Sequence, residues 1–379
     1  MSRFAFFTRV GRQTALVALV GLTAGCSLGR APQTPTPASP STPTRTLQPS
    51  ATPVPTATPV RTPPALPSPF STDLLNPRDT PRTYQTDTCQ YLHDRWDPAN
   101  SPPGTVAMVI MFHSVTEDPI SNPNQISLAA FQGLMEGLKA AGFEAVRTTQ
   151  LADFLERNVR IPPRSVLLVA DDRHYGAYFE KLFRPYRERF GWPVVNSWIS
   201  AEGTAPDLWA DNSDLEMQGW VDHQAHGVVH NIPIWPGSTD AYILGELQGS
   251  VDAFEEHFGK RPIAFIWPGG GFSPRAAELA RQTGYQLGFT INPRGPVMFN
   301  WVPLGDQEDP MRPSYQPEAG VNDPLMVLPR YWDTDAILYL QDIVAIGEQA
   351  AEQAEQQRST ELDFYEIMCA STYGVLPPP

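Results

Sequence analysis

The sequence predicts an α/β protein built on a parallel sheet or barrel, in which strands and helices alternate along the chain. From residue 105 onward, short β-rich runs alternate with stretches whose apolar residues recur at helical spacing. About seven such strand and helix pairs follow over roughly 270 residues, which suits one barrel better than two small domains. No internal sequence repeat accompanies the alternation.

The individual elements follow from local patterns. The first strand is expected at residues 105–115, a nearly continuous apolar run, and the first helix at 128–141, whose apolar side chains share one face. Ser273 followed by Pro274 predicts a later helix start, because serine caps a helix and proline suits its first position. Asp333 is expected to cap a helix that runs to about residue 349. Further strands are predicted at 144–147, 165–170, 194–199, 263–267, 286–291 and 326–328, and further helices at 151–156, 178–190 and 239–258.

Proline content divides the chain. Of 379 residues, 41 are proline, and residues 31–70 are almost entirely Pro, Thr, Ser and Ala. Such a segment cannot bury enough apolar surface to offset its ordering entropy, so a disordered, semi-rigid tether is predicted at residues 27–83. Folding is assigned to residues 84–379, which carry a net charge of about −20. We expect no nucleic-acid partner, because phosphate binding needs a basic surface.

The first 26 residues resemble an export signal of the bacterial lipoprotein type. Three arginines precede an apolar run at residues 15–22 that is too short to span a membrane, and small residues lead up to Cys26. In such a signal the chain is cut before the cysteine, which then carries a lipid. We therefore expect an exported protein that lipidated Cys26 anchors to the outer face of the cell membrane, or that is otherwise extracellular. Ordinary cleavage is the alternative, because Thr23 stands where leucine is preferred.

Only two cysteines remain in the part assigned to folding, Cys89 and Cys369, one near each of its ends. Disulfides persist in the compartments that exported proteins reach, so a bond joining the two ends is one interpretation. Two independent buried thiols are the other.

Two adjacent carboxylates, Asp171 and Asp172, follow the apolar run at residues 165–170. In barrels of parallel strands, the loops at the C-terminal ends of the strands build the active site. Two carboxylates this close to an apolar core repel each other unless a cation or a proton separates them. The alternative is that the pair caps the following helix.

His226 and His230 stand four residues apart, a spacing that puts two imidazoles on one face of a helical turn, where one divalent metal reaches both. Together with a strand-end aspartate they give a His, His, Asp set with at least one open coordination position. Such an open set is typical of a catalytic site. We therefore expect a divalent metal, Zn²⁺, as the cofactor.

These motifs arrive in the order seen in the polysaccharide deacetylases, the family with the NodB homology domain, which the chain resembles over roughly residues 105–335. The sequence VADDRHYG resembles the family's first motif. The resemblance implies that Asp171 is the general base and that Asp172, His226 and His230 bind the metal. It also implies a distorted (β/α) barrel.

A third motif, AFIWPGGG, resembles the family's substrate-groove strand. It implies that Trp267, Gly269 and Gly270 line the groove and that a backbone N–H near the two glycines stabilises the oxyanion. MFHSV resembles a motif of the branch that deacetylates exopolysaccharide glucosamine polymers. That resemblance implies that His113 is the general acid.

The chain also departs from the family pattern. Ala170 replaces the usual phenylalanine, Arg173 replaces a glycine beside the expected metal, and Ile266 stands where one form of the third motif has arginine. Arg173 is a candidate to hold Asp171 ionised or to block the substrate groove. Arg330, at the end of a late strand, is assigned to the substrate groove and is a second candidate partner for a site carboxylate, with an ordinary surface ion pair as the alternative.

The resemblance implies a metal-dependent hydrolase that removes acetyl groups, N-acetyl or O-acetyl, from an envelope or extracellular polysaccharide. The expected partners are that acetylated polysaccharide and, through the lipid anchor only, a membrane; no protein partner is predicted. A catalytically silent, membrane-tethered carbohydrate-binding protein on the same scaffold is one alternative. A glycoside hydrolase is another, although it needs a further acid to flank the scissile bond.

Overall fold

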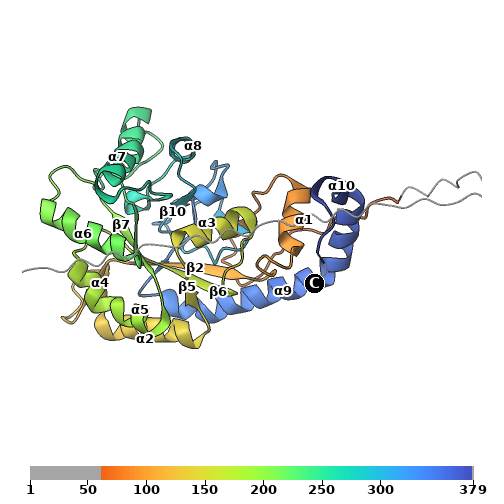
Figure 1. The fold of residues 1–379 in the computed structure, drawn as a ribbon, viewed down its shortest axis with the longest axis horizontal. Helices are drawn as coiled ribbons and strands as arrows, with labels where there is room; N and C mark the ends of the chain where they lie inside the picture. Colours follow the sequence, from red (N-terminus) through yellow and green to blue (C-terminus); the bar gives the residue numbers. More distant parts are fainter. Residues whose placement is uncertain (1–60, 378–379) are drawn as a thin grey trace, which may run out of the picture. The chain divides into compact units, whose positions relative to one another are not determined.

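A parallel sheet forms the centre of the computed structural model, which describes residues 61–377. Helices pack around this sheet (Figure 1). All pairs of neighbouring strands in the sheet run parallel. In spatial order they are β10 (Leu287–Phe289), β9 (Ala264–Ile266), β8 (Val221–Ala225), β7 (Val194–Trp198), β6 (Arg164–Ala170), β2 (Val106–Phe112) and β12 (Tyr331–Trp332), with β5 (Glu144–Ala145) also paired to β6.

The sheet curls so that its two edge strands, β10 and β12, are linked by one short segment. Leu328 makes an isolated parallel bridge to Phe289 of β10, and three residues later Tyr331 pairs with Ile110 of β2. The chain from Leu328 onward therefore crosses the gap between the two edges. This arrangement confirms the predicted α/β fold with a barrel-like parallel sheet.

The central strands are buried on both faces, which explains their continuous apolar sequence. On β2, Met108 and Ile110 pack in a cluster with side chains of the helices on one side, while Ala107 and Val109 face the other cluster. All seven residues of β2 are buried. Because these strands fix the position of the sheet's C-terminal edge, the loops that follow them start from a rigid base.

Helices follow most of the strands. Their bounds are α1 (Thr88–Trp96), α2 (Leu128–Ala140), α3 (Thr148–Arg157), α4 (Gly176–Leu182), α5 (Arg184–Phe190), α6 (Pro206–Gln218), α7 (Asp240–Phe258), α8 (Pro274–Thr283), α9 (Ala336–Met368) and α10 (Ala370–Tyr373). Two short pairs of strands lie outside the main sheet: β1 (Asp79–Arg82) with β11 (Val302–Gly305), and β3 (Ser114–Thr116) with β4 (Gln125–Ser127). Ser273 caps α8 as predicted, accepting from the backbone N–H of Ala276.

Several element boundaries differ from the prediction. The helix expected at residues 178–190 is split into α4 and α5, because Pro185 has no N–H to continue a single ladder. No strand forms at 326–328: Met326 ends a 3₁₀ turn, η2 (Pro324–Met326), and only Leu328 bridges to β10.

The folded unit begins earlier than the predicted boundary at residue 84. β1 pairs antiparallel with β11, and Leu75, which precedes β1, is buried. The prediction of a disordered tether is therefore wrong for residues 75–83. Their backbone pairs with β11, and side chains such as Leu75 are buried in the folded unit.

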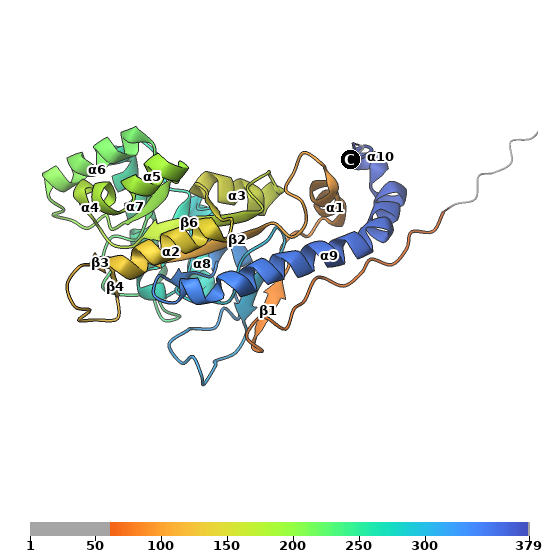
Figure 2. The same ribbon diagram turned by 90° about the horizontal axis from the view of Figure 1, so that it is seen from below.

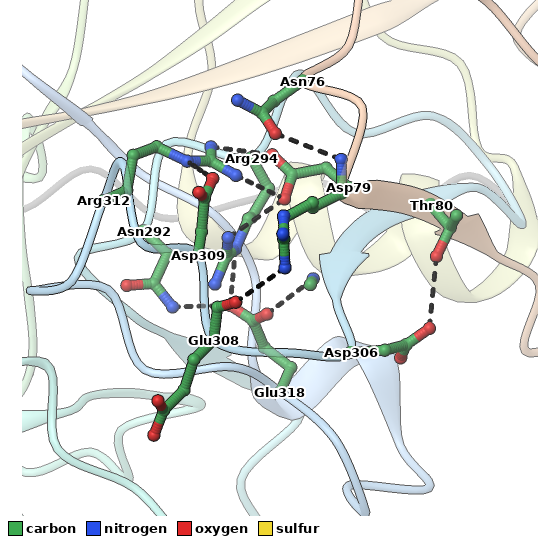
Figure 3. A network of polar contacts seen from close by, with 12 residues as sticks. Asn76, Asp79, Thr80, Asn292, Arg294, Asp306, Glu308, Asp309, Arg312 and Glu318 are labelled. Carbon is green, nitrogen blue, oxygen red and sulfur yellow. Dashed lines mark hydrogen bonds and ion pairs between the residues drawn. The ribbon is translucent and has the colours of Figure 1, made fainter.

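A buried ionic network attaches β1 to the rest of the unit (Figure 3). The fully buried carboxylate of Asp79 accepts hydrogen bonds from Arg294 at 3.0 Å and from Arg312 at 2.8 Å. Arg294 also donates to Glu318, which in turn accepts from the backbone N–H of Gly305. Buried charges of this kind persist only when they are paired, so Asp79 is an integral part of the fold.

Within residues 61–377, no helix has both the length and the apolar character that crossing a membrane requires. The predicted export signal at residues 1–26, Cys26 itself and residues 27–60 of the predicted tether lie outside the described residues. Localisation therefore stays a prediction.

Helix α9 is much longer than the helix predicted to end near residue 349. The residues beyond that point are mostly Ala, Glu and Gln, which are strong helix formers, and no glycine or proline interrupts them before Met368. The helix begins two residues later than predicted, with Asp335 rather than Asp333 at its N-cap.

The far end of α9 is fixed to the N-terminal part of the folded unit. Figure 2 shows α9 running past α2 and out to α1. A disulfide joins Cys89 of α1 to Cys369, the residue that ends α9. Leu92 and Tyr365 are buried beside it in a small apolar cluster. The two ends of the folded unit are thus covalently joined.

Candidate metal and catalytic site

The two adjacent carboxylates at the end of β6 lie in different environments. Asp171 is buried, and its backbone N–H donates to the carbonyl of Phe112 on β2 at 2.7 Å. Asp172 has a φ of 66°, and its side chain is 44% exposed. The left-handed backbone at Asp172 turns its carboxylate away from the core. Neither aspartate caps α4, whose N-cap residue is Tyr175.

Asp171 forms a buried ion pair with Arg330. The Nη1 of Arg330 lies 2.7 and 2.9 Å from the two carboxylate oxygens, and both side chains are almost inaccessible. Burial alone would raise the pKa of Asp171, but the Arg330 guanidinium, helped by His226 and His113, holds it well below its usual range. Asp171 is therefore a carboxylate at neutral pH. The sequence predicted that Arg330 lines the substrate groove. That prediction is wrong, because Arg330 is fully buried.

His226 and His230 are not on a helical turn, contrary to the prediction. His226 directly follows β8, and His230 lies in the succeeding loop with a φ of 54°. The loop nevertheless folds back, so that the two Nε2 atoms are 3.1 Å apart. The Nδ1–H of His226 donates to the carbonyl of Ile266 at 2.8 Å, which leaves its Nε2 facing His230.

Asp172, His226 and His230 bring their ligand atoms within 4.8 Å of one another. The Oδ1 of Asp172 is 3.3 Å from the Nε2 of His230. A tetrahedral zinc ion with bonds of about 2.0–2.1 Å separates its ligand atoms by about 3.3 Å, so the 3.1 Å between the two imidazoles and the 3.3 Å between His230 and Asp172 fit such an ion. Burial also lowers the pKa of His226, which keeps the ring neutral as a metal ligand requires.

His113 directly follows β2 and lies close to Asp171. Its Nε2 is 3.7 Å from Oδ2 of Asp171, and its ring stacks on Trp332 with centroids 5.2 Å apart. The structure thus brings the base candidate Asp171 close to a second imidazole and to the metal ligand His226. Such an arrangement can accept a proton at the carboxylate and donate one from the imidazole.

The turn after β9 matches the groove prediction only in part. Trp267 is fully buried and donates its indole N–H to the carbonyl of Met326, so it cannot stack on a sugar. The N–H of Gly270 donates to the carbonyl of Trp267 at 2.8 Å and is not free for an oxyanion. Gly269 is exposed, with a φ of 56° that favours glycine. Of the two glycines, Gly269 alone remains a candidate groove residue.

Arg173 forms its hydrogen bond with a hydroxyl group and not with the carboxylates. Its Nη1 donates to the hydroxyl of Thr204, in the loop that precedes α6. The cation that holds Asp171 ionised is therefore Arg330 and not Arg173. The hydrogen bond to Thr204 also gives Arg173 a partner other than the metal ligands.

Sequence reasoning missed Asp333 as a residue of this neighbourhood. It directly follows β12, its side chain is buried, and its Oδ2 has no hydrogen-bond partner among the described residues. Burial raises the pKa of Asp333 to about 7, opposed by a backbone N–H and reinforced by the charge of Asp171. Its position one residue after Trp332 at a strand end was the available signal, because carboxylates at the C-terminal edge of a barrel collect around the site.

Comparisons with known proteins point to one family. Residues 162–288 match the family model described as polysaccharide deacetylase. A curated relative, "Putative polysaccharide deacetylase YxkH" of Bacillus subtilis (strain 168), is 20% identical over 186 residues, which make up 49% of this chain and 64% of the relative. The match therefore spans less than two thirds of that relative's length.

Solved structures of deacetylases are similar at low sequence identity. The deacetylase PplD of Streptococcus pyogenes in complex with acetate has a TM-score of 0.48 and 17% identity, over 63% of this chain and 98% of that chain. IcaB from Ammonifex degensii has a TM-score of 0.47 and 18% identity, over 64% of this chain and 97% of that chain.

The match to the family model includes the end of β6, with Asp171 and Asp172, and the end of β8, with His226 and His230. The matched range therefore contains the three candidate metal ligands and the candidate base, whereas His113 and Arg330 lie outside it. Over residues 162–288, this chain is thus similar to the polysaccharide deacetylase family.

Proposed function

We propose that this chain is a metal-dependent hydrolase that removes acetyl groups, from nitrogen and secondarily from oxygen, on an envelope or extracellular polysaccharide. The observation that carries the proposal is the convergence of Asp172, His226 and His230 within 4.8 Å, beside the buried and ionised Asp171. A divalent ion bound by these three side chains would supply a Lewis acid for the acetyl carbonyl and for water.

Asp171 and His113 carry out the two proton transfers of the reaction. Asp171 is the general base that accepts the proton of the attacking water, and Arg330 keeps it ionised for that role. His113, whose Nε2 is 3.7 Å from Asp171, donates a proton to the leaving amine. The backbone at Gly269, where no side chain intervenes, is the candidate donor to the oxyanion.

We place this activity outside the cytoplasm, tethered by the N-terminal segment. The support is the arginine-flanked apolar run, the small residues before Cys26 and the proline-rich stretch that follows. The disulfide between Cys89 and Cys369 is consistent with an oxidising compartment.

The test is to purify the full chain, measure its bound metal by mass spectrometry, and assay acetate release from acetylated glucosamine oligomers and from acetylated xylan. Two adjacent variants separate the roles. Asp172→Ala should abolish metal retention, because one of three ligands is lost. Asp171→Asn should retain the metal and reduce turnover by about 10²- to 10⁴-fold, the usual contribution of a general base.

Three results would count against the proposal. Acetate release that survives chelation would remove the metal from the mechanism. Bound metal without acetate release from any substrate would favour the catalytically silent scaffold. Full activity in both aspartate variants would refute the assigned roles.

A further inference from the structure

A cavity of about 290 Å³, lined in part by Trp332, lies near the candidate acid His113, and none of the metal ligands lines it. Trp332 connects the two sites, because it lines this cavity and stacks on His113. The volume is at the lower end of the range for small-molecule pockets, which suits one small unit of a larger ligand. All lining residues fall outside residues 162–288, so this cavity is built by the parts of the chain that the family model does not match.

The cations that line this cavity are already neutralised. Arg294 and Arg312 both donate to the buried Asp79, and each has a further carboxylate partner, Glu318 and Asp309 respectively. The network in Figure 3 therefore holds the cavity wall in place without offering a free positive charge. An anionic ligand has no available partner among these residues.

The remaining polar lining is aromatic and acidic. Tyr339 and Asp342 lie near the start of α9 and are exposed, and Asp335 is the N-cap of that helix. Within residues 61–377, neither Asp335 nor Asp342 forms an ion pair. The rings of Tyr331 and Tyr339 contact each other with centroids 5.0 Å apart. Aromatic faces next to unpaired carboxylates are the chemistry that recognises a protonated amine.

We propose that this cavity is a subsite for an amino sugar whose amine is free and protonated, next to the unit that undergoes deacetylation. The inference rests on the proposed function, because removal of an N-acetyl group creates such an amine. The aromatic ring of Tyr339 packs on the sugar and its cation, Asp342 binds the ammonium group, and Asp335 adds a second negative charge to the cavity lining. A polymer that already carries deacetylated units is then held beside the site, whereas a polymer of uronic acids is repelled.

The test measures binding rather than turnover, with the full chain kept metal-free. Calorimetric titration compares a tetramer of glucosamine with a tetramer of N-acetylglucosamine, at a pH where the amines are protonated. We expect the glucosamine tetramer to bind at least about tenfold more tightly. Asp342→Asn and Tyr339→Ala should each weaken its binding by at least about fivefold and leave the weak binding of the N-acetylated tetramer nearly unchanged.

Matched controls come from the same helix. Glu352→Gln removes an exposed carboxylate of α9, and Leu338→Ala removes an exposed apolar side chain next to Tyr339; neither residue lines the cavity. Both controls should bind like the unchanged chain. Should Asp342→Asn lower the thermal stability, Asp335→Asn provides a second carboxylate variant.

The subsite proposal is overturned if the two tetramers bind equally, or if Asp342→Asn and Glu352→Gln weaken binding alike. Failure of the proposed function is a different result, since it is read as absent acetate release from the metal-loaded chain. Amine-selective binding without acetate release would support the subsite and contradict the proposed function. Acetate release without amine selectivity would support the proposed function and contradict the subsite.

Discussion

At Asp171, one buried ion pair determines the protonation state on which a base role depends. The carboxylate is surrounded by the core, and only Arg330, at 2.7 and 2.9 Å, compensates its charge fully. Because the pKa of Asp171 is held below its usual range, this pair stabilises the fold at any pH above about 4 and ceases to do so only in stronger acid. The same contact therefore serves stability and chemistry.

Arg330→Met should lower the free energy of unfolding by about 3–5 kcal/mol at pH 7, because it leaves a buried carboxylate without its cation. Urea denaturation measures the change. In the double variant Arg330→Met with Asp171→Asn most of the loss should be recovered, since an amide needs no counter-charge. Equal losses in the single and double variants would show that Arg330 stabilises the fold by packing and not by pairing with Asp171.

Asp333 should make stability depend on pH in the opposite direction. Its folded pKa is raised to about 7, so its stabilising contribution is complete below about pH 4 and is lost as the pH rises through 7. Asp333→Asn, of nearly the same shape, should have no such loss and be more stable than the unchanged chain at pH 8 by a few kcal/mol. Urea denaturation of both proteins at pH 5 and pH 8 gives the comparison, and parallel pH dependence would contradict the prediction.

The sequence predicted which residues form much of the candidate site, but it predicted less well the backbone conformation that brings them together. The spacing of His226 and His230 indicated that they bind the same metal ion. The predicted helical turn was wrong, because the loop after β8 brings the two side chains together instead. The burial of Trp267 could not be foreseen, since an aromatic residue at a strand end suits both core and groove. Asp333 was assigned to a helix cap because aspartate is a common capping residue. Its burial beside the site depends on distant elements and could not be predicted.

Among the secondary-structure elements, α9 shows most clearly what local sequence can and cannot specify. Strong helix formers continue past residue 349, and the helix accordingly runs to Met368. Strands were predictable where both faces are buried, as in β2 and β6. Residues 326–328 resembled a strand because three apolar residues in a row carry no periodicity. The pairing of Cys89 with Cys369 depends on α9 and α1 meeting, which no local pattern encodes.

Replacing Cys89 and Cys369 together by serine should destabilise the protein by about 2–5 kcal/mol, because the crosslink restricts a long loop of the unfolded chain. Thermal unfolding of the oxidised protein and of the double variant measures the difference. Acetate release per folded molecule should stay unchanged, since the bond joins α1 to the end of α9 and not the strand ends that hold the site. A selective loss of activity in a fully folded variant would contradict this assignment.

For the molecule as a whole, the position of the N-terminal boundary matters. Asp79→Asn should cost about 3–5 kcal/mol, because two guanidiniums lose a fully buried partner. Asp306→Asn is the matched control: Asp306 pairs with Arg82 at the exposed surface, so its loss should cost less than about 1 kcal/mol. Chemical denaturation of the full chain compares the two, and equal costs would show that Asp79 is not needed to fix β1.

The bond between Cys89 and Cys369 closes 280 positions of sequence into one covalent ring. A protease that cuts a surface loop once between these cysteines opens the ring but releases no fragment. The nicked protein keeps the mass of the uncut chain, plus one water, until a reductant is added. For an enzyme outside the cytoplasm, as we propose, a single cleavage by a protease then leaves both pieces covalently attached.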